Sequence, residues 1–246
     1  MRIAFLADIH SNLEALNACL ANARERAIDR YVFLGDIVGY GADPSACVDI
    51  VGEACANGAK AVIGNHDEAV IKSSFKLNEA AATAVTWTAS VLSPEQRSFL
   101  ANLPLSISDE DRLYVHASAH AAASYPYVTS LSDAGECLTA TPARLTLCGH
   151  VHAPALYNIS LTAKVMGFIP NSEAPIPLTA MRRWLTVSGA VGQPRDGNPA
   201  AAYTTLDTTT NEITFVRVPY DVDRAAAKIR AAGLPERLWK RLSEGR

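Results

Sequence analysis

Histidines that directly follow short apolar runs are the feature that most constrains the fold of this chain. There are only six histidines among 246 residues, and five of them come after such runs: His10, His66, His116, His150 and His152. A short apolar run bounded by turn residues is typical of a buried strand. The pattern therefore predicts several strands that each deliver an imidazole at the strand end, which is hard to explain with histidines that only fill a core.

The stretch Gly64-Asn65-His66-Asp67 places an amide, an imidazole and a carboxylate at consecutive positions after the apolar run 60–63. Asn, His and Asp are also ordinary turn residues, so these four residues alone indicate little. Together with the other strand-end histidines, they favour a metal site.

The first third of the chain predicts a β-α-β-α-β unit. The apolar run 3–7 ends at Asp8 and His10, the run 31–34 ends at Asp36, and the third run ends before Asn65. A helix begins in the pattern Ser11-Asn12-Leu13-Glu14, which is typical of a capping box, and a second helix follows Asp43-Pro44 and closes at Asn57-Gly58. In such sheets the ligand site lies beyond the carboxyl ends of the strands. A helix that begins just after His10 would favour an anion such as phosphate.

The rest of the chain becomes richer in strands. Residues 78–103 are expected to be helical, with a restart at Ser93-Pro94. Strands are expected at 112–115, 144–148, 155–161, 184–187, 201–206 and 212–218, an exposed loop at 170–177 and a hairpin turn at 208–211. Two short helices split at 233–235 form a C-terminal tail over 221–246, whose basic residues are expected to form a solvated face. We interpret residues 1–246 as a single domain.

Composition excludes several classes of protein. A net charge of −3 argues against a general nucleic-acid or anionic-membrane surface, and no run approaches the roughly 18 apolar residues of a membrane span. The N-terminus does not resemble a signal peptide, so we expect a cytoplasmic protein. The five cysteines lack C-x-x-C spacing and are expected to be reduced thiols.

The complete series of motifs resembles that of the calcineurin-like metallophosphoesterases. These motifs are Asp8-x-His10, Gly35-Asp36, Gly64-Asn65-His66-Asp67, His116 and Gly149-His150-x-His152. The segments 39–44 and 193–197 resemble the bacterial phosphodiesterase-like branch, which also resembles diadenosine tetraphosphatases. The resemblance spans residues 3 to 206 and implies an α/β fold in which two mixed β-sheets pack as a sandwich with helices on the outer faces, four layers in all.

The resemblance also implies two metal ions. Asp8, His10, Asp36 and His152 would hold one ion, and Asp36 would bridge to a second ion held by Asn65, His116 and His150. Mixed nitrogen and oxygen ligands suit Mn, Fe, Zn or Co, divalent or in mixed valence, better than Mg or Ca. Two carboxylates and a bridging hydroxide leave such a centre with net positive charge, which attracts phosphate.

By the same resemblance, the bridging hydroxide attacks phosphorus in line while His66 acts as general acid and Asp67 orients its ring. Arg195 is a candidate phosphate clamp, and Asn12 is a further candidate for substrate contact. Ser11 stands where the family usually has glycine, and Thr186–Ala190 stand where it more often has Asn-Pro-Gly-Ser. His120 matches no ligand motif and is expected to be structural or to lie just behind the ligands.

Three readings of function follow from these residues. The first is a hydrolase of small phosphodiesters or phosphomonoesters, with a nucleotide hydrolase of the diadenosine tetraphosphate type as its alternative. The second is a non-catalytic metal-binding scaffold, although no ligand is missing. The third is a DNA nuclease, against which the net charge of −3 argues. The substrate, the native metals, the oligomeric state and the role of residues 162–182 as a lid stay open in the sequence.

Overall fold

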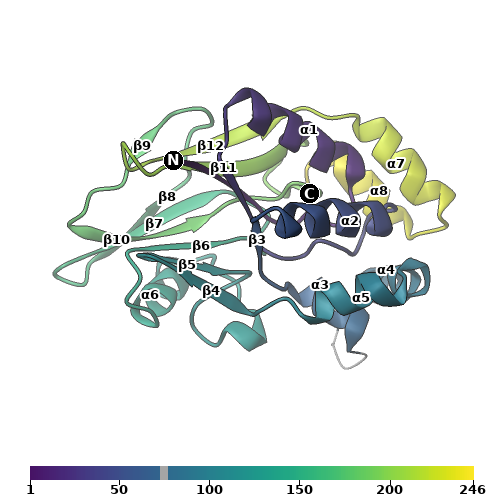
Figure 1. Ribbon diagram of the computed structural model, residues 1–246, viewed down its shortest axis with the longest axis horizontal. Helices are drawn as coiled ribbons and strands as arrows, with labels where there is room; N and C mark the ends of the chain where they lie inside the picture. The colour runs from purple at the N-terminus through teal and green to yellow at the C-terminus, as the bar shows by residue number, and fades with distance from the viewer. Residues whose placement is uncertain (73–76) are drawn as a thin grey trace.

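Two six-stranded mixed sheets form the centre of the molecule, as the computed structural model of residues 1–72 and 77–246 shows (Figure 1). The first sheet has the order β3 (Lys60–Ala61), β2 (Arg30–Phe33), β1 (Arg2–Leu6), β11 (Ala201–Asp207), β12 (Glu212–Val218), β9 (Ile176–Pro177). The second has the order β4 (Ser106–Asp109), β5 (Arg112–Val115), β6 (Leu145–Cys148), β10 (Arg182–Val187), β7 (Ala155–Ser160), β8 (Val165–Phe168).

Each sheet contains a block of three parallel strands. In the first sheet β1, β2 and β3 run parallel, and in the second β5, β6 and β10 do. The remaining strand pairs are antiparallel. The loops after the six parallel strands are therefore the expected place for a ligand site.

The two sheets pack face to face through apolar side chains. On β1, Ile3 and Phe5 point into the space between the sheets and meet Tyr114 and Leu147 of the second sheet. Ala4 and Leu6 point to the other face of the first sheet. Because successive side chains alternate and both faces are covered, β1 reads as a continuous apolar run in the sequence.

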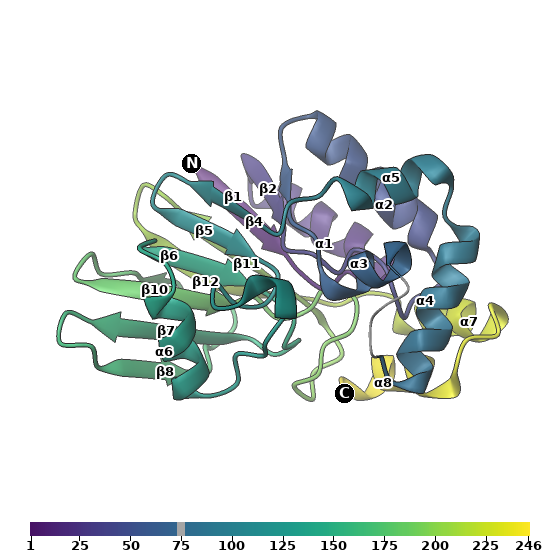
Figure 2. The same ribbon diagram turned by 90° about the horizontal axis from the view of Figure 1, so that it is seen from below.

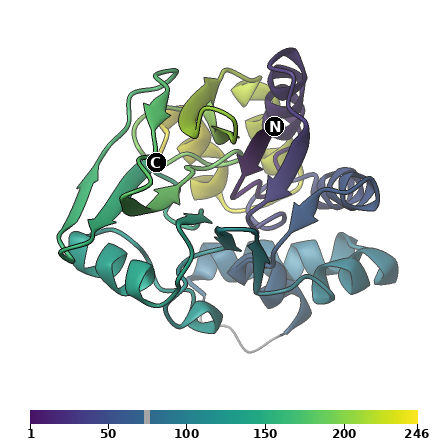
Figure 3. The ribbon, with the colours of Figure 1, turned by 60° about the vertical axis from the view of Figure 1, so that its left-hand side comes forward.

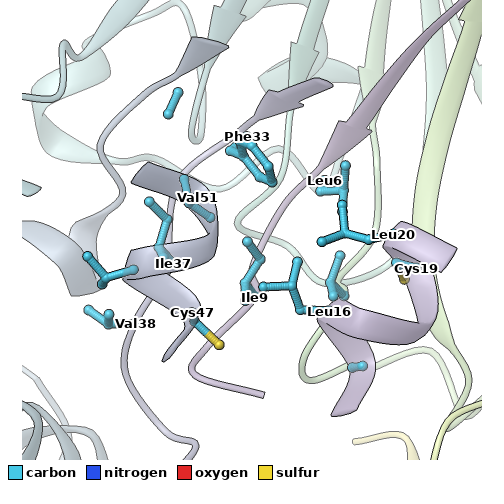
Figure 4. Packing of buried hydrophobic residues seen from close by; sticks show 14 of the residues in the cluster. Leu6, Ile9, Leu16, Cys19, Leu20, Phe33, Ile37, Val38, Cys47 and Val51 are labelled. Carbon is cyan, nitrogen blue, oxygen red and sulfur yellow. The ribbon is translucent and has the colours of Figure 1, made fainter. Parts of the chain in front are cut away.

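Helices cover the outer faces. Helices α1 (Leu13–Glu25) and α2 (Pro44–Ala56) pack on the first sheet around Leu6, Phe33 and Leu16 (Figure 4). Helix α6 (Leu131–Thr139) covers the second sheet through Ala134, Cys137 and Leu138 (Figure 2). In Figure 3 the purple α1 and the teal α6 lie on opposite sides of the strands. The expected sandwich with outer helices is thus confirmed.

The remaining helices lie beyond one end of the sheets (Figure 2). They are α3 (Asn65–Ile71), α4 (Glu79–Val91), α5 (Pro94–Ala101), α7 (Val222–Ala231) and α8 (Glu236–Glu244), and a short 3₁₀ turn spans Ala122–Ser124. The tail helices bury Ile229, Leu238 and Leu242 against Tyr40 and Ala84 from the first half of the chain. These contacts join the tail to the first half of the chain, and the single domain over residues 1–246 stays a prediction.

The predicted capping box at Ser11 is wrong. Asn12 is the N-cap of α1, and its side chain accepts from the backbone N–H of Ala15 at 3.1 Å. Ser11 has φ +54° because its backbone N–H and carbonyl join two other loops, through Ile37 and Asp43. An N-cap needs an extended backbone. Glu14 instead forms ion pairs with Arg224 and Lys228 of α7, so the basic tail is less solvated than predicted.

Strands β4, β8 and β9 were not expected from the sequence. The residues of β8 are mostly exposed and those of β9 number only two, inside the predicted loop 170–177. Short strands at sheet edges carry little apolar patterning. Both strands lie in segment 162–182, whose role the sequence did not decide. Strand β8 pairs with β7, and β9 pairs with β12.

In the described part of the chain, no helix has both the length and the apolar character needed to cross a bilayer. All five cysteines are free in the structure, and four of them are buried.

Replacing Leu16 by alanine is expected to lower the free energy of unfolding by about 2 to 5 kcal/mol, because a fully buried side chain leaves a cavity between α1 and the first sheet. Urea denaturation followed by circular dichroism measures this change. Leu161→Ala is the matched control: this leucine is 79% exposed, so we expect a change within about 0.5 kcal/mol. Equal effects of the two substitutions would contradict the packing of α1.

Candidate metal centre

The parallel strands bring the predicted ligands together from both sheets. Asp8 and His10 follow β1, Asp36 follows β2, and Asn65 opens α3 just after β3. From the second sheet, His116 follows β5, while His150 and His152 follow β6. The Asp and His ligands are nearly inaccessible to solvent, with exposed fractions between 0% and 6%. Buried polar groups of this kind need partners or a metal.

Backbone hydrogen bonds tie these loops to one another. The backbone N–H of Asp8 donates to the carbonyl of Gly35, and that of His10 donates to the carbonyl of Asp36. The N–H of His150 donates to the Asp8 carboxylate at 2.9 Å, which joins the two sheets. The Asp36 carboxylate accepts from the N–H of His66 at 2.8 Å. The ligand loops are therefore held as one network.

Five of the ligand residues adopt the left-handed backbone conformation, which is costly for residues with a side chain. They are Asp8, His10, Asp36, His150 and His152, with φ between +48° and +66°. Backbone strain concentrated in this way is typical of functional sites.

The side chains form two groups whose ligand atoms lie within 4.8 Å of one another: Asp8 with His10 and His152, and Asp36 with His116 and His150. In the second group, Nε2 of His116 lies 3.2 Å from Nδ1 of His150 and 3.1 Å from Oδ1 of Asn65. Oδ2 of Asp36 is 3.4 Å from Nε2 of His116 and 3.6 Å from Nε2 of His10. This one carboxylate oxygen thus faces both groups.

The pair His10 and His152 tests whether these donors fit a cation. Their Nε2 atoms lie 3.1 Å apart, while the Nδ1 atoms face the carbonyl oxygens of Val38 and Gln193 at 3.1 and 2.6 Å. A carbonyl only accepts, so both Nδ1 atoms carry hydrogen. Burial holds the pKa of both rings well below its usual value, so the rings are neutral and each Nε2 presents a lone pair. Two facing lone pairs repel unless a cation lies between them, so the donor set fits a metal ion.

Burial and neighbouring charges shift the pKa values of the carboxylates and histidines of the site. Burial raises the pKa of Asp8 to about 8. Burial also acts to raise the pKa of Asp36, but His116 and His66 outweigh it and hold that pKa well below its usual value. For His116, burial acts to lower the pKa, yet Asp36 dominates and raises it to about 9. A bound metal displaces such protons.

Two glycines allow the loops to approach the carboxylates. A Cβ atom at Gly64 would lie 2.2 Å from Oδ1 of Asp36, and one at Gly149 would lie 2.6 Å from Oδ2 of Asp8. Both distances are shorter than any normal contact. These glycines precede the ligands Asn65 and His150, so the close approach explains the Gly-Asn-His and Gly-His patterns of the sequence.

His66 lies beside the two groups and is 4% exposed. Its ring contacts the rings of Tyr40 and His10, with centroids 4.4 and 5.0 Å apart. Its Nδ1 is buried without a hydrogen-bond partner in the described chain, and burial lowers the pKa of the ring.

The expected contact between Asp67 and the His66 ring is wrong. The two oxygens of Asp67 accept from the backbone N–H groups of Val38 and Gly64, each at 3.0 Å. Consecutive residues of a helix point in directions about 100° apart, so Asp67 closes the start of α3 and fixes the Asp36 loop instead.

The two residues expected to contact substrate differ in their surroundings. Asn12 caps α1 and donates from its amide to the carbonyl of Gly192 at 2.8 Å, so structural contacts occupy it. Arg195 lies above Tyr40, with the guanidinium carbon 5.6 Å from the ring centroid, and its Nε is buried without a partner among the described residues. Its backbone N–H donates to the carbonyl of His152 at 3.0 Å, and its charge lowers the pKa of His10, His66, His150 and His152.

Sequence reasoning missed three neighbours of the ligands and misplaced a fourth residue. The Tyr40 ring contacts both His10 and His66, Tyr127 stacks on His150 with centroids 4.1 Å apart, and the Gln193 carbonyl accepts from His152. The motif segments 39–44 and 193–197 contained Tyr40 and Gln193, but nothing marked Tyr127. His120 is exposed and lies 3.9 Å from Glu136, so it is not behind the ligands.

A buried set of nitrogen and oxygen donors at the carboxyl ends of strands from two sheets defines a metal-dependent hydrolase of the two-metal class. The model of the calcineurin-like phosphoesterase superfamily domain matches residues 1–211, and the chain belongs to this family. The family and the two ligand groups support a dinuclear metal centre and the hydrolysis of phosphate esters.

Relatives match along nearly the whole chain. An uncharacterized protein of Methanocaldococcus jannaschii is 36% identical over 255 residues, which cover 99% of this chain and 98% of that protein. The crystal structure of a metallophosphoesterase from Sphaerobacter thermophilus is 36% identical with a TM-score of 0.86, covering 100% and 99% of the two chains. A hypothetical protein from Pyrococcus horikoshii OT3 shares the fold, with 19% identity, a TM-score of 0.80 and coverage of 100% and 98%.

His152→Ala is expected to reduce the metal bound per chain, because His10 then lacks the facing nitrogen and Asp8 loses a neighbour 3.4 Å away. Elemental analysis after dialysis at limiting metal measures the metal content. His120→Ala removes an exposed imidazole and is expected to leave the content unchanged. If both variants lose metal equally, or neither does, His152 is not a ligand.

Proposed function

We propose that this protein hydrolyses phosphodiester or phosphomonoester bonds of small substrates at a dinuclear centre. The observation that carries the proposal is Asp36 Oδ2, which faces both ligand groups from 3.4 and 3.6 Å. As ligands we propose Asp8, His10, Asp36 and His152 for one ion, and Asp36, Asn65, His116 and His150 for the other. When bound, two divalent ions polarise the phosphate and activate a water for in-line attack.

The residues around the ligands supply the other requirements of phosphoryl transfer. The guanidinium of Arg195 has a buried Nε without a partner, and an oxygen of the substrate phosphate is a fitting acceptor. Tyr40 and Tyr127 cover His10, His66 and His150 with aromatic surface, which limits access of bulk water.

His66 is the group that we assign to protonation of the leaving oxygen. Burial lowers the pKa of its ring, so it is neutral before substrate binds. The negative charge of a bound phosphate raises the pKa of a nearby imidazole, so substrate binding loads the ring with the proton that it later donates. No carboxylate contacts its Nδ1 among the described residues, so Tyr40 and Gly39, rather than Asp67, hold the ring in place.

Hydrolysis of a diadenosine tetraphosphate-type nucleotide is the alternative within the same chemistry. A metal-binding scaffold without activity is a weaker alternative, because every predicted ligand and His66 are present. Mn, Fe, Zn and Co remain the metals that suit this donor set.

We expect metal-stripped protein to regain hydrolysis of bis-p-nitrophenyl phosphate or p-nitrophenyl phosphate when Mn, Fe, Zn or Co is supplied singly. Release of p-nitrophenolate measures this, and diadenosine tetraphosphate is compared by chromatography. The order of kcat/KM among the three substrates separates diesterase, monoesterase and nucleotide hydrolase. Tight binding of two ions without turnover of any of the three substrates would favour the non-catalytic scaffold.

His66→Asn is expected to keep the metal content and to lower turnover of phenyl phosphate by about 100-fold or more, the scale of lost general acid catalysis. The loss should be smaller with p-nitrophenyl phosphate, because p-nitrophenol is more acidic than phenol and leaves without a proton. His120→Asn serves as the matched control. A loss of the same size for both leaving groups would assign His66 to positioning rather than to proton transfer.

A further inference from the structure

Three arginines gather beside the metal centre without any carboxylate. They are Arg195, in the loop after β10, and Arg237 and Arg241, one turn apart on the same face of α8. Within the described residues, none of the three lies within ion-pair distance of an acidic group, whereas Arg224 of the tail and Arg217 of β12 do. Like charges that share a site repel one another unless an anion joins them.

Arg195 and Arg241 share a single acceptor. Oε1 of Gln193, a residue that is 1% exposed, lies 3.0 Å from Nη2 of Arg195 and 3.3 Å from Nη1 of Arg241. The backbone carbonyl of the same Gln193 accepts from the metal-site ring of His152. Two guanidinium groups are thus held side by side, next to the ligands, by one neutral oxygen. Nε of Arg195 is buried without a partner among the described residues.

Helix α8 is fixed in this position by its apolar face. Leu238 and Leu242 are buried in a cluster that includes Tyr40, the residue that contacts His10 and His66. At the end of the helix, the carbonyl of Gly245 accepts from the N–H of Gly197, in the loop that carries Arg195. The arginines of α8 are therefore part of a packed structure and not of a loose tail.

Arg195 is tied directly to a predicted ligand, because its backbone N–H donates to the carbonyl of His152 at 3.0 Å. Arg195 influences the pKa of Asp8 and of four histidines. Burial lowers the pKa of Arg241, and its strongest charged neighbours are Arg195 and Arg237 rather than any ligand. A phosphate at the metals would therefore meet Arg195 first, while Arg241 meets the site through Gln193 and has Arg237 one turn before it on α8.

We propose that Arg241 and Arg237 of α8 bind a second phosphate group, adjoining the one that is hydrolysed. This rests on the proposed function and narrows its substrate to esters with two linked phosphates, such as a nucleoside diphosphate. The match to the family model does not include α8, because the match ends at residue 211 and α8 begins at Glu236. The C-terminal tail then sets the specificity of a shared catalytic centre.

The test compares adenosine 5′-diphosphate with adenosine 5′-monophosphate as competitors of bis-p-nitrophenyl phosphate hydrolysis at saturating metal. We expect the diphosphate to compete at least about ten-fold better, and Arg241→Met to remove most of that preference, because a charge-assisted contact is lost. Arg241→Lys should retain part of it. Chelation of the metals by the diphosphate would also give a preference, but one that persists in Arg241→Met.

Lys240→Met is the matched control, since it removes one positive charge from the same helix at an exposed position paired with Glu236. It should leave the preference unchanged. If Arg241→Met folds poorly, the preference for the diphosphate is measured in Arg237→Met instead, because Arg237 is exposed. Equal competition by the two nucleotides, or an unchanged preference in Arg241→Met and Arg237→Met, overturns the subsite.

Failure of the proposed function is distinguished by calorimetry. If no metal restores hydrolysis, the two nucleotides are titrated directly into metal-loaded protein and its Arg241→Met variant. A diphosphate preference that the substitution removes supports the subsite even without turnover, and its absence in the wild-type protein rejects the subsite.

Discussion

The facing nitrogens of His10 and His152 are the contact on which the rest of the site depends. Each ring is fixed from behind by a backbone carbonyl, so neither can turn its lone pair away. The repulsion between them is tolerated only because the fold holds both loops, and a cation converts it into attraction. The two residues lie 142 positions apart and follow strands of different sheets. The packing of the two sheets thus fixes the separation of these two loops.

Holding the loops in this way is costly for the backbone. Five ligand residues in the left-handed conformation cost about 1 kcal/mol each or more, which is a sizeable share of the stability of an ordinary domain, about 5 to 15 kcal/mol. The apolar layers on both faces of β1 and β2 offset this cost. The left-handed residues lie in the loops after β1, β2 and β6 and not within these strands, so the strain falls where it positions the predicted ligands. The stability of the apolar core is therefore what allows the strained loops of the site to persist.

Sequence and structure agree wherever the signal is local or carried by burial. The strands before Asp8, Asp36 and His116 are buried on both faces, so their apolar runs could be recognised directly. The motif order also identified the family and the sandwich. Ser11 and Asp67 were misread because each takes part in a hydrogen bond to a loop distant in the sequence, through Ile37 and Val38. The edge strands β8 and β9 were missed because exposed short strands need no apolar pattern.

The basic tail is the clearest case in which the sequence could not reveal function. A run with Arg237, Lys240 and Arg241 reads as a solvated helix face, and for Lys240 this reading is right, since it is exposed and pairs with Glu236. Arg241 differs only because Leu238 and Leu242 turn α8 so that this arginine meets Gln193, 48 positions away. Which basic residue serves solubility and which serves recognition is therefore decided by the packing of its apolar neighbours. With the proposed subsite, α8 would set the substrate without any change to the metal ligands.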